Sequence, residues 1–194
     1  FNKFPSLESQ VASISDDIAY NNHDLEDGLR AGLFSINDLR SIPFIGNYVD
    51  KHLKNIKNYR KEIIINQIVR DLINLMVMDV INTTKRNLRK KKPKTLNDIY
   101  KQNYKLVDFS NKMKLIDKEV KYFLKVNMYN NTKVIRNTNL GKRIIKDLFI
   151  YLSKNPKKFI NNNLFKRNKK ERVIADFIAG MTDRYAINLQ KNIK

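Results

Sequence analysis

Apolar residues along this chain recur at spacings of three and four, and the strict alternation of apolar and polar residues that marks a strand is almost absent. Glycine (5) and proline (4) are scarce, so few positions interrupt a helix. The pattern predicts an all-α fold, a compact multi-helix domain without a significant sheet. We expect helices or helical turns over about 5–30, 35–39, 43–53, 60–88, 108–128, 140–152 and 169–190.

The first helix is expected to open at Pro5 and Ser6 and to end near Arg30, where Gly28 and Gly32 loosen it. Its predicted inward stripe consists of Leu7, Val11, Ile14, Ile18, Leu25 and Leu29. Other inward positions are Ile45, Val49 and Leu53; Ile64, Ile68, Leu72, Leu75 and Val80; and Met113, Ile116, Val120, Phe123 and Leu124. We expect one domain over 1–194, with 1–32 as the helix that carries the chemistry and 33–194 as a C-terminal helical region.

Further expectations concern single segments. The run 85–94 is expected to be a basic connector that ends at Pro93, and Asn130-Asn131 and Asn161-Asn162-Asn163 indicate turns or loops. His52 lies between Lys51 and Lys54 and is expected to be exposed. In the last helix, Gly180 would let another helix approach, and Arg184 lies near the apolar side, so a buried partner is expected; that apolar side carries Val173, Ile174, Phe177, Ile178, Met181 and Tyr185.

The composition excludes several classes of protein. Cysteine is absent, which rules out disulfides, thiolate metal sites and cysteine nucleophiles. No apolar run approaches the length needed to span a bilayer, and the first residues do not resemble a signal peptide. We therefore expect a soluble cytoplasmic protein with no membrane partner.

The net charge of +20 suggests a polyanionic partner, but composition supplies another explanation. Lys, Asn and Ile dominate the chain, and AT-rich codons encode all three. The run from Lys85 to Lys92 is thus either a solvated connector or a contact for single-stranded nucleic acid or a regulatory nucleotide. Residues 1–30 differ, because six carboxylates there face only two cations.

Those carboxylates gather on one side of the first helix. Asp16, Tyr20 and Asp24 are spaced i, i+4 and i+8, which places them within about 80° of each other on a helix, opposite the apolar stripe. His23 and Asp27 fall on the same face. A solvated polar face is one interpretation; a site for a metal ion or a cationic partner is the other, since crowded like charges cost energy without a cation among them.

Several blocks of the sequence resemble the dGTPase-like branch of the HD-superfamily triphosphohydrolases. The matches occur in order along the chain, and only 85–104 is poorly matched. The similar segments are 5–11, 16–32, Phe123-Leu124 with Tyr129 and Val134, Leu148-Phe149, and 172–186.

The resemblance implies hydrolysis of a deoxynucleoside triphosphate to deoxynucleoside and tripolyphosphate, with a divalent cation such as Mg²⁺ or Mn²⁺. In that family a His, a His-Asp doublet and a later Asp hold the cation. Asp16 matches the later Asp, Tyr20 matches a tyrosine at the triphosphate, and Asp24 matches the carboxylate that accepts the sugar 3′-hydroxyl. His23, Asp27 and Arg184 are further candidates. The resemblance also implies a homo-oligomer.

The chain departs from the family in its metal ligands. Only His23 and His52 are present, and the His and the His-Asp doublet should lie well before Asp16. His23-Asp24 is not that doublet, because it follows the ligand Asp. We therefore expect this chain to be the carboxyl-terminal half, inactive alone, with an upstream half that brings the missing ligands. The alternative is a non-catalytic basic helical module that binds nucleic acid or a partner subunit.

Overall fold

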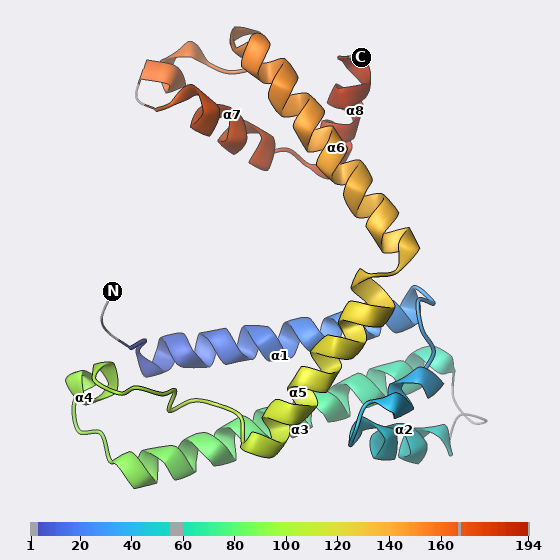
Figure 1. Cartoon of the computed structure of the whole chain (residues 1–194), viewed down its shortest axis with the longest axis vertical. Coiled ribbons are helices and arrows are strands. Elements are labelled where there is room, and N and C mark those ends of the chain that lie inside the picture. The colour runs from blue at the N-terminus through green and yellow to red at the C-terminus, as the bar shows by residue number, and fades with distance from the viewer. Residues whose placement is uncertain (1–3, 55–59, 167, 194) are drawn as a thin grey trace. The chain divides into compact units, whose positions relative to one another are not determined.

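The computed structural model describes residues 4–54, 60–166 and 168–193, and within them every regular element is helical (Figure 1). The expected all-α class is confirmed. The chain divides into two compact units, Phe1–Asn131 and Thr132–Lys194. A single domain over 1–194 stays a prediction. None of the helices described is long and apolar enough to cross a membrane.

The first unit is built around two long helices. Helices α1 (Leu7–Arg30) and α3 (Lys61–Lys91) run antiparallel and pack on each other, and α5 (Asn111–Leu124) packs on α1 (Figure 1). A 3₁₀ turn η1 (Asn37–Ser41) and helix α2 (Ile45–Leu53) cover one end of α3. The short α4 (Leu96–Tyr100) follows α3, and a single π-helical turn, η2 (Lys125–Tyr129), continues α5.

The limits of α1 follow from its sequence. The Ser6 hydroxyl caps the helix by accepting a hydrogen bond from the Ser9 N–H at 3.3 Å. Gly32, at φ +66°, ends it in the left-handed region that favours glycine. Gly28 does not loosen the helix as expected. It is a buried position inside α1, and the ring of Phe34 packs where a side chain would stand.

Most of the predicted inward positions form the core of this unit. Leu25, Leu29, Ile64, Ile68 and Leu72 are almost fully buried, as are the predicted positions of α5. Val11 is the exception, because it is 48% exposed. It borders a hollow that α1, α3 and Val107 line.

The basic run is helical, so the expected connector over 85–94 is wrong. Lys and Arg are good helix formers, and Lys85–Lys91 make the last turns of α3. The helix stops at Lys92, whose φ of 46° places it in the left-handed region, and Pro93 follows. Proline disfavours the α conformation of the residue before it, which explains the stop.

His52 is buried, contrary to expectation. It is 8% exposed, and its Nε2 lies 2.9 Å from the Asp71 carboxylate, which joins α2 to α3. The neighbouring lysines indicated exposure, but His52 lies on the face of α2 that also carries the buried Val49.

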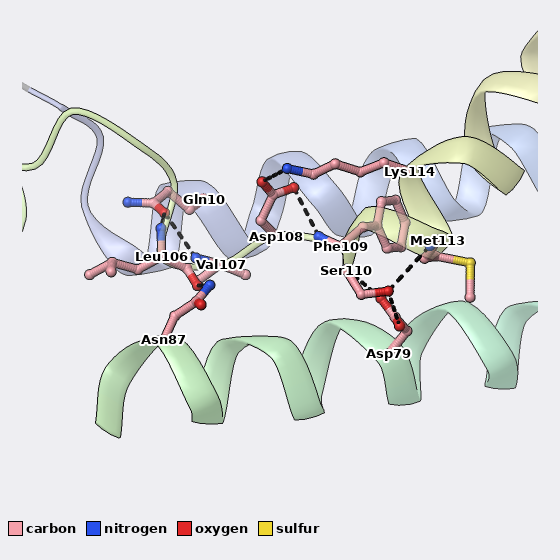
Figure 2. Close-up of polar contacts among 10 residues, drawn as sticks. All are labelled: Gln10, Asp79, Asn87, Leu106, Val107, Asp108, Phe109, Ser110, Met113 and Lys114. Atoms are coloured by element: carbon pink, nitrogen blue, oxygen red, sulfur yellow. Dashed lines mark hydrogen bonds and ion pairs between the residues drawn. The ribbon is translucent and has the colours of Figure 1, made fainter. Parts of the chain in front are cut away.

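The segment after α4 is held between α1 and α3 (Figure 2). The Gln10 side chain of α1, itself 2% exposed, accepts hydrogen bonds from the N–H groups of Leu106 at 2.8 Å and Val107 at 3.1 Å. From α3, the Asn87 amide donates to the Leu106 carbonyl at 3.0 Å. Buried backbone groups need such partners, so these two side chains fix a stretch without regular structure.

Ser110 connects this segment to the start of α5 (Figure 2). Its hydroxyl accepts from the Met113 N–H at 3.2 Å and donates to Asp79 of α3 at 2.7 Å, and its own N–H donates to Asp79 at 2.8 Å. One residue thus caps a helix and ties it to a second one.

We expect Ser110→Ala to lower the free energy of unfolding by about 1–2 kcal/mol, because both the cap and a charge-assisted hydrogen bond are lost. Ser6→Ala is the matched control: Ser6 caps α1 with one exposed bond, so its loss should cost less than 1 kcal/mol. Urea denaturation of both variants measures the difference. Equal losses would contradict the role given to Asp79.

The second unit contains α6 (Thr132–Lys154), two 3₁₀ turns, η3 (Pro156–Lys158) and η4 (Asn162–Lys166), and helices α7 (Lys170–Ala179) and α8 (Asp183–Asn192). Helix α6 packs against α7 and α8. The buried core positions of the second unit include Ile144, Leu148, Leu152, Ile160, Val173, Ile174 and Leu189.

Two expectations fail in this unit. Helix α6 starts eight residues earlier than the expected 140, directly after the predicted turn at Asn130-Asn131. The expected helix over 169–190 is broken, because the Thr182 hydroxyl caps a new helix by accepting from the Tyr185 N–H at 3.3 Å. Gly180 is the C-cap of α7, and a β-carbon added there would meet only the carbonyl oxygens of Asp176 and Phe177 of the same helix within 4 Å, among the described residues.

Candidate functional site

The outer face of α1 carries the residues that the sequence singled out. Asp16 is exposed, and Tyr20 is 63% exposed one turn later. Ile14 and Ile18 bury the opposite side of the same turns, so the helix turns this polar face away from the core. The i, i+4 spacing therefore presents a carboxylate and a phenol side by side at the surface.

Asp24, the third member of this series, is partly buried and has a partner that the sequence analysis did not assign. The Tyr129 hydroxyl donates a hydrogen bond to the Asp24 carboxylate. Burial raises the pKa of the Tyr129 phenol well above its usual value, and the bond to Asp24 and the Asp24 charge raise it further, with a smaller contribution from Tyr20. Tyr129 is therefore a neutral donor at any working pH.

The π-helical turn explains how Tyr129 reaches α1. At the α-helical advance of about 100° per residue, Tyr129 would point away from the face of α5 that buries Val120 and Leu124. Over 125–129 the helix winds more widely, and the Asn130 N–H bonds the Lys125 carbonyl five residues back. The smaller advance per residue turns Tyr129 toward α1.

Polar contacts between α1 and α5 stand beside this pair. The Asn21 amide donates to Asp117 at 2.8 Å, and Lys121 pairs with Asp117 at 2.9 Å. The Lys121 ammonium also lies 3.8 Å from Asp17. Asp17 therefore faces α5 and a cation, whereas its neighbour Asp16 points to solvent.

His23 and Asp27 are both exposed on α1. The His23 Nδ1 lies 3.9 Å from Glu26, on the side of α1 that faces α3. Glu26 also pairs with Arg30 at 2.8 Å, and Arg30 donates to Asn66 of α3 at 2.6 Å. Arg30 therefore compensates the charge of Glu26. The structure does not bring His23 or Asp27 together with Asp16 in one cluster.

Arg184 does not have the buried partner that its position suggested. It lies exposed in the first turn of α8, and it forms no ion pair with the described residues of its unit. The break at Thr182 starts a new helix, so the helical wheel of a continuous last helix does not apply to it.

The described residues contain no group of three or more His, Asp or Glu side chains that could hold a metal ion. Asp16 offers one carboxylate, and Asp24 is engaged by Tyr129. Since a hydrolytic metal needs several protein ligands, the described residues do not form a complete metal site.

We expect Tyr129→Phe to remove the last tyrosine to ionise. A raised pKa contributes stability that is fully present below the unfolded value of about 10 and is lost as the pH rises through the folded value. Absorbance titration of the nine tyrosines should thus lose its latest component. Tyr122→Phe, at an exposed position of α5, is the matched control and should leave that latest component in place. Loss of the same component in both variants would contradict the Asp24 bond.

Part of this chain matches the model of a known protein family. Residues 107–192 match the family model of the Phosphohydrolase-associated domain, which covers the end of the first unit and nearly all of the second.

The whole chain is also similar to proteins named Deoxyguanosinetriphosphate triphosphohydrolase-like protein. The Pelagibacter ubique protein is 53% identical over 193 residues, which are 100% of this chain and 52% of the relative. The Rickettsia typhi protein is 39% identical over 96% of this chain and 50% of the relative, and that of Leptospira interrogans is 37% identical over 97% and 51%. The resemblance to the dGTPase-like triphosphohydrolases is confirmed, and the chain spans about half the length of these relatives.

Proposed function

We propose that this chain is the carboxyl-terminal half of a deoxynucleoside triphosphate triphosphohydrolase and contributes one wall of its active site. The observation that carries the proposal is the outer face of α1: the exposed Asp16 and Tyr20 and the partly buried Asp24 follow each other along one stripe, within a chain similar throughout its length to dGTPase-like proteins. A purely solvated face would not require Asp24 to be held by a tyrosine from another element.

The reaction hydrolyses the bond between the 5′-oxygen and the α-phosphorus. Water adds to the phosphorus, the 5′-oxygen leaves with a proton as the deoxynucleoside, and tripolyphosphate is released. On α1, Asp16 would lie at the metal, Tyr20 at the triphosphate and Asp24 at the sugar 3′-hydroxyl. The eight residues from Asp16 to Asp24 rise about 12 Å along the helix, which is a nucleotide-sized distance.

Asp24 is suited to accept a hydroxyl. Tyr129 bonds its Oδ2 and leaves Oδ1 for a second donor. A carboxylate that accepts from a neutral phenol and a sugar hydroxyl forms charge-assisted bonds with both. Tyr20, 63% exposed, has room to rotate toward a phosphate.

Asp16 would provide one ligand to a divalent cation, which would polarise the α-phosphate in the completed protein. Because the described residues of this chain supply no further ligands around Asp16, no catalytic step belongs to this chain alone. The relatives contain about as much sequence again as this chain matches, and we assign the remaining ligands to that other half.

The proposal is tested by measuring tripolyphosphate released from dGTP with Mg²⁺ or Mn²⁺. We expect release by the complete protein and none by the purified 194-residue chain. Adding the separately produced other half should restore release. Turnover by the chain alone would contradict the division of the site, and a complete protein inactive on every deoxynucleoside triphosphate would contradict the function.

A further inference from the structure

A cavity with cationic side chains in its lining lies in the first unit, away from the outer face of α1. It has a volume of about 470 Å³ and is bounded by the last turns of α3, the segment 104–110 and the start of α5. Three cationic side chains line it: Arg86 from α3, and Lys112 and Lys114 from α5. No acidic side chain among the described residues lines it, and the uncharged polar lining is Thr83, Asn87, Tyr104, Ser110 and Asn111.

The charges around this cavity are only partly compensated. Lys114 pairs with Asp108, and the Lys112 ammonium stands over the Phe44 ring at 3.7 Å from its centroid. Asp79, the other nearby carboxylate, accepts both hydrogen bonds from Ser110. Arg86 forms no ion pair with any described residue. One paired cation, one over an aromatic ring and one unpaired guanidinium thus leave a net positive potential in a concave space, where field lines are focused.

The walls of the cavity are fixed before any ligand arrives. Figure 2 shows Asn87 and Asp79 rising from α3 to hold Leu106 and Ser110, with Lys114 and Asp108 above them. Gln10 secures the same segment from α1. Because the segment that carries Ser110 is already ordered, a ligand would not bear the entropy cost of ordering it.

The side chains of the basic run at the end of α3 point to different sides of the helix. Thr83, Arg86 and Asn87 face the cavity at i, i+3 and i+4, and the Lys91 ammonium lies 5.0 Å from the centroid of the Tyr104 ring beside it. Lys85 lines the apolar hollow against α1 instead. The run is therefore not one uniform stripe that an extended polyanion would follow, because only Arg86 of its cations lines the cavity.

We propose that this cavity binds the phosphate group of a small ligand, with the Arg86 guanidinium as the main contact. Its planar donors match two oxygens of a phosphate, and the Lys112 and Lys114 side chains line the same cavity. Tyr104, 38% exposed at the edge, offers a ring face to an aromatic group attached to the phosphate. This inference stands on the cavity itself and does not depend on the proposed hydrolysis.

The test is a ¹H–¹⁵N NMR titration of the 194-residue chain with sodium phosphate and, separately, phenyl phosphate, each against sodium chloride of equal ionic strength. We expect saturable shifts in the amides of 83–87 and 110–114 with both phosphates and none with chloride. Tighter binding of phenyl phosphate would identify a phosphate ester as the ligand, and equal affinities would identify free phosphate.

Arg86→Gln should weaken binding by about ten-fold, because a charge-assisted bidentate contact is lost. Arg89→Gln is the matched control, since Arg89 is exposed on the same helix but does not line the cavity, and it should leave the affinity unchanged. Both variants should keep the helical circular dichroism of the parent. Absence of saturable shifts, or equal weakening by the two variants, would overturn the proposal and indicate diffuse attraction to a basic surface.

Discussion

Replacing Asp16 with Asn in the complete protein is expected to reduce tripolyphosphate release from dGTP by more than about 100-fold. Changes to groups that merely orient metal ligands cost 10- to 100-fold, so loss of a ligand should cost more. The substitution keeps the size of the side chain and removes its charge. Because Asp16 is exposed and forms no ion pair with described residues, the free energy of unfolding should not fall.

Asp17→Asn provides the control for this experiment. It makes the same chemical change one residue further along α1, at a side chain that faces Lys121 at 3.8 Å. Exposed ion pairs contribute little, so stability should change by less than about 1 kcal/mol and turnover should be retained. Full turnover by the Asp16 variant, with loss in the Asp17 variant, would show that the ligand had been assigned to the wrong residue.

Gly28→Ala is expected to lower the free energy of unfolding by about 1–3 kcal/mol, which is opposite to the effect of helix propensity. A β-carbon at this position would lie 2.3 Å from Cε1 and 2.4 Å from Cζ of Phe34. Phe34 cannot move freely, since it is 7% exposed and packs edge-on against Phe123 with 4.9 Å between ring centroids. Thermal or urea denaturation of the two proteins measures the change.

A double-mutant cycle separates this clash from other effects of the glycine. Phe34→Leu removes the ring atoms that the new methyl group meets, so Gly28→Ala should be close to neutral in that background. Gly141→Ala, in α6 with no atom within 4 Å of the added carbon, should not destabilise the protein. If Gly28→Ala costs the same with and without the Phe34 ring, the steric explanation is wrong.

Helical spacing predicted the parts of the fold that depend on local periodicity. The stripe of Ile14, Ile18 and Leu25 and the inward face of α5 are buried as expected, because an amphipathic helix has one way to hide its apolar side. The acidic outer face of α1 was also evident from the sequence alone.

Buried polar residues were not predictable in the same way. Gln10, Asn21 and Asn22 are polar residue types that usually lie at the surface, yet each is at most 4% exposed. Gln10 and Asn21 have partners about a hundred residues away in the chain, at Leu106 and Asp117, and spacing within one helix carries no information on them. His52 was misjudged for the same reason, since Asp71 lies on another helix.

The position of Tyr129 could not be predicted because the helix does not keep the α-helical number of residues per turn there. Its side was set by one turn of π-helix, and a constant 100° advance places it elsewhere. Such turns have no strong sequence signal, so the partner of Asp24 could be found only in three dimensions.

The Tyr129–Asp24 bond also joins two parts of the sequence that could otherwise have evolved separately. Tyr129 lies within the segment 107–192 that matches the phosphohydrolase-associated domain, whereas Asp24 lies on α1, outside it. This bond therefore ties the matched segment to the helix that carries Asp24. A change in the winding of 125–129 would move the partner of the Asp24 carboxylate without altering any residue of α1.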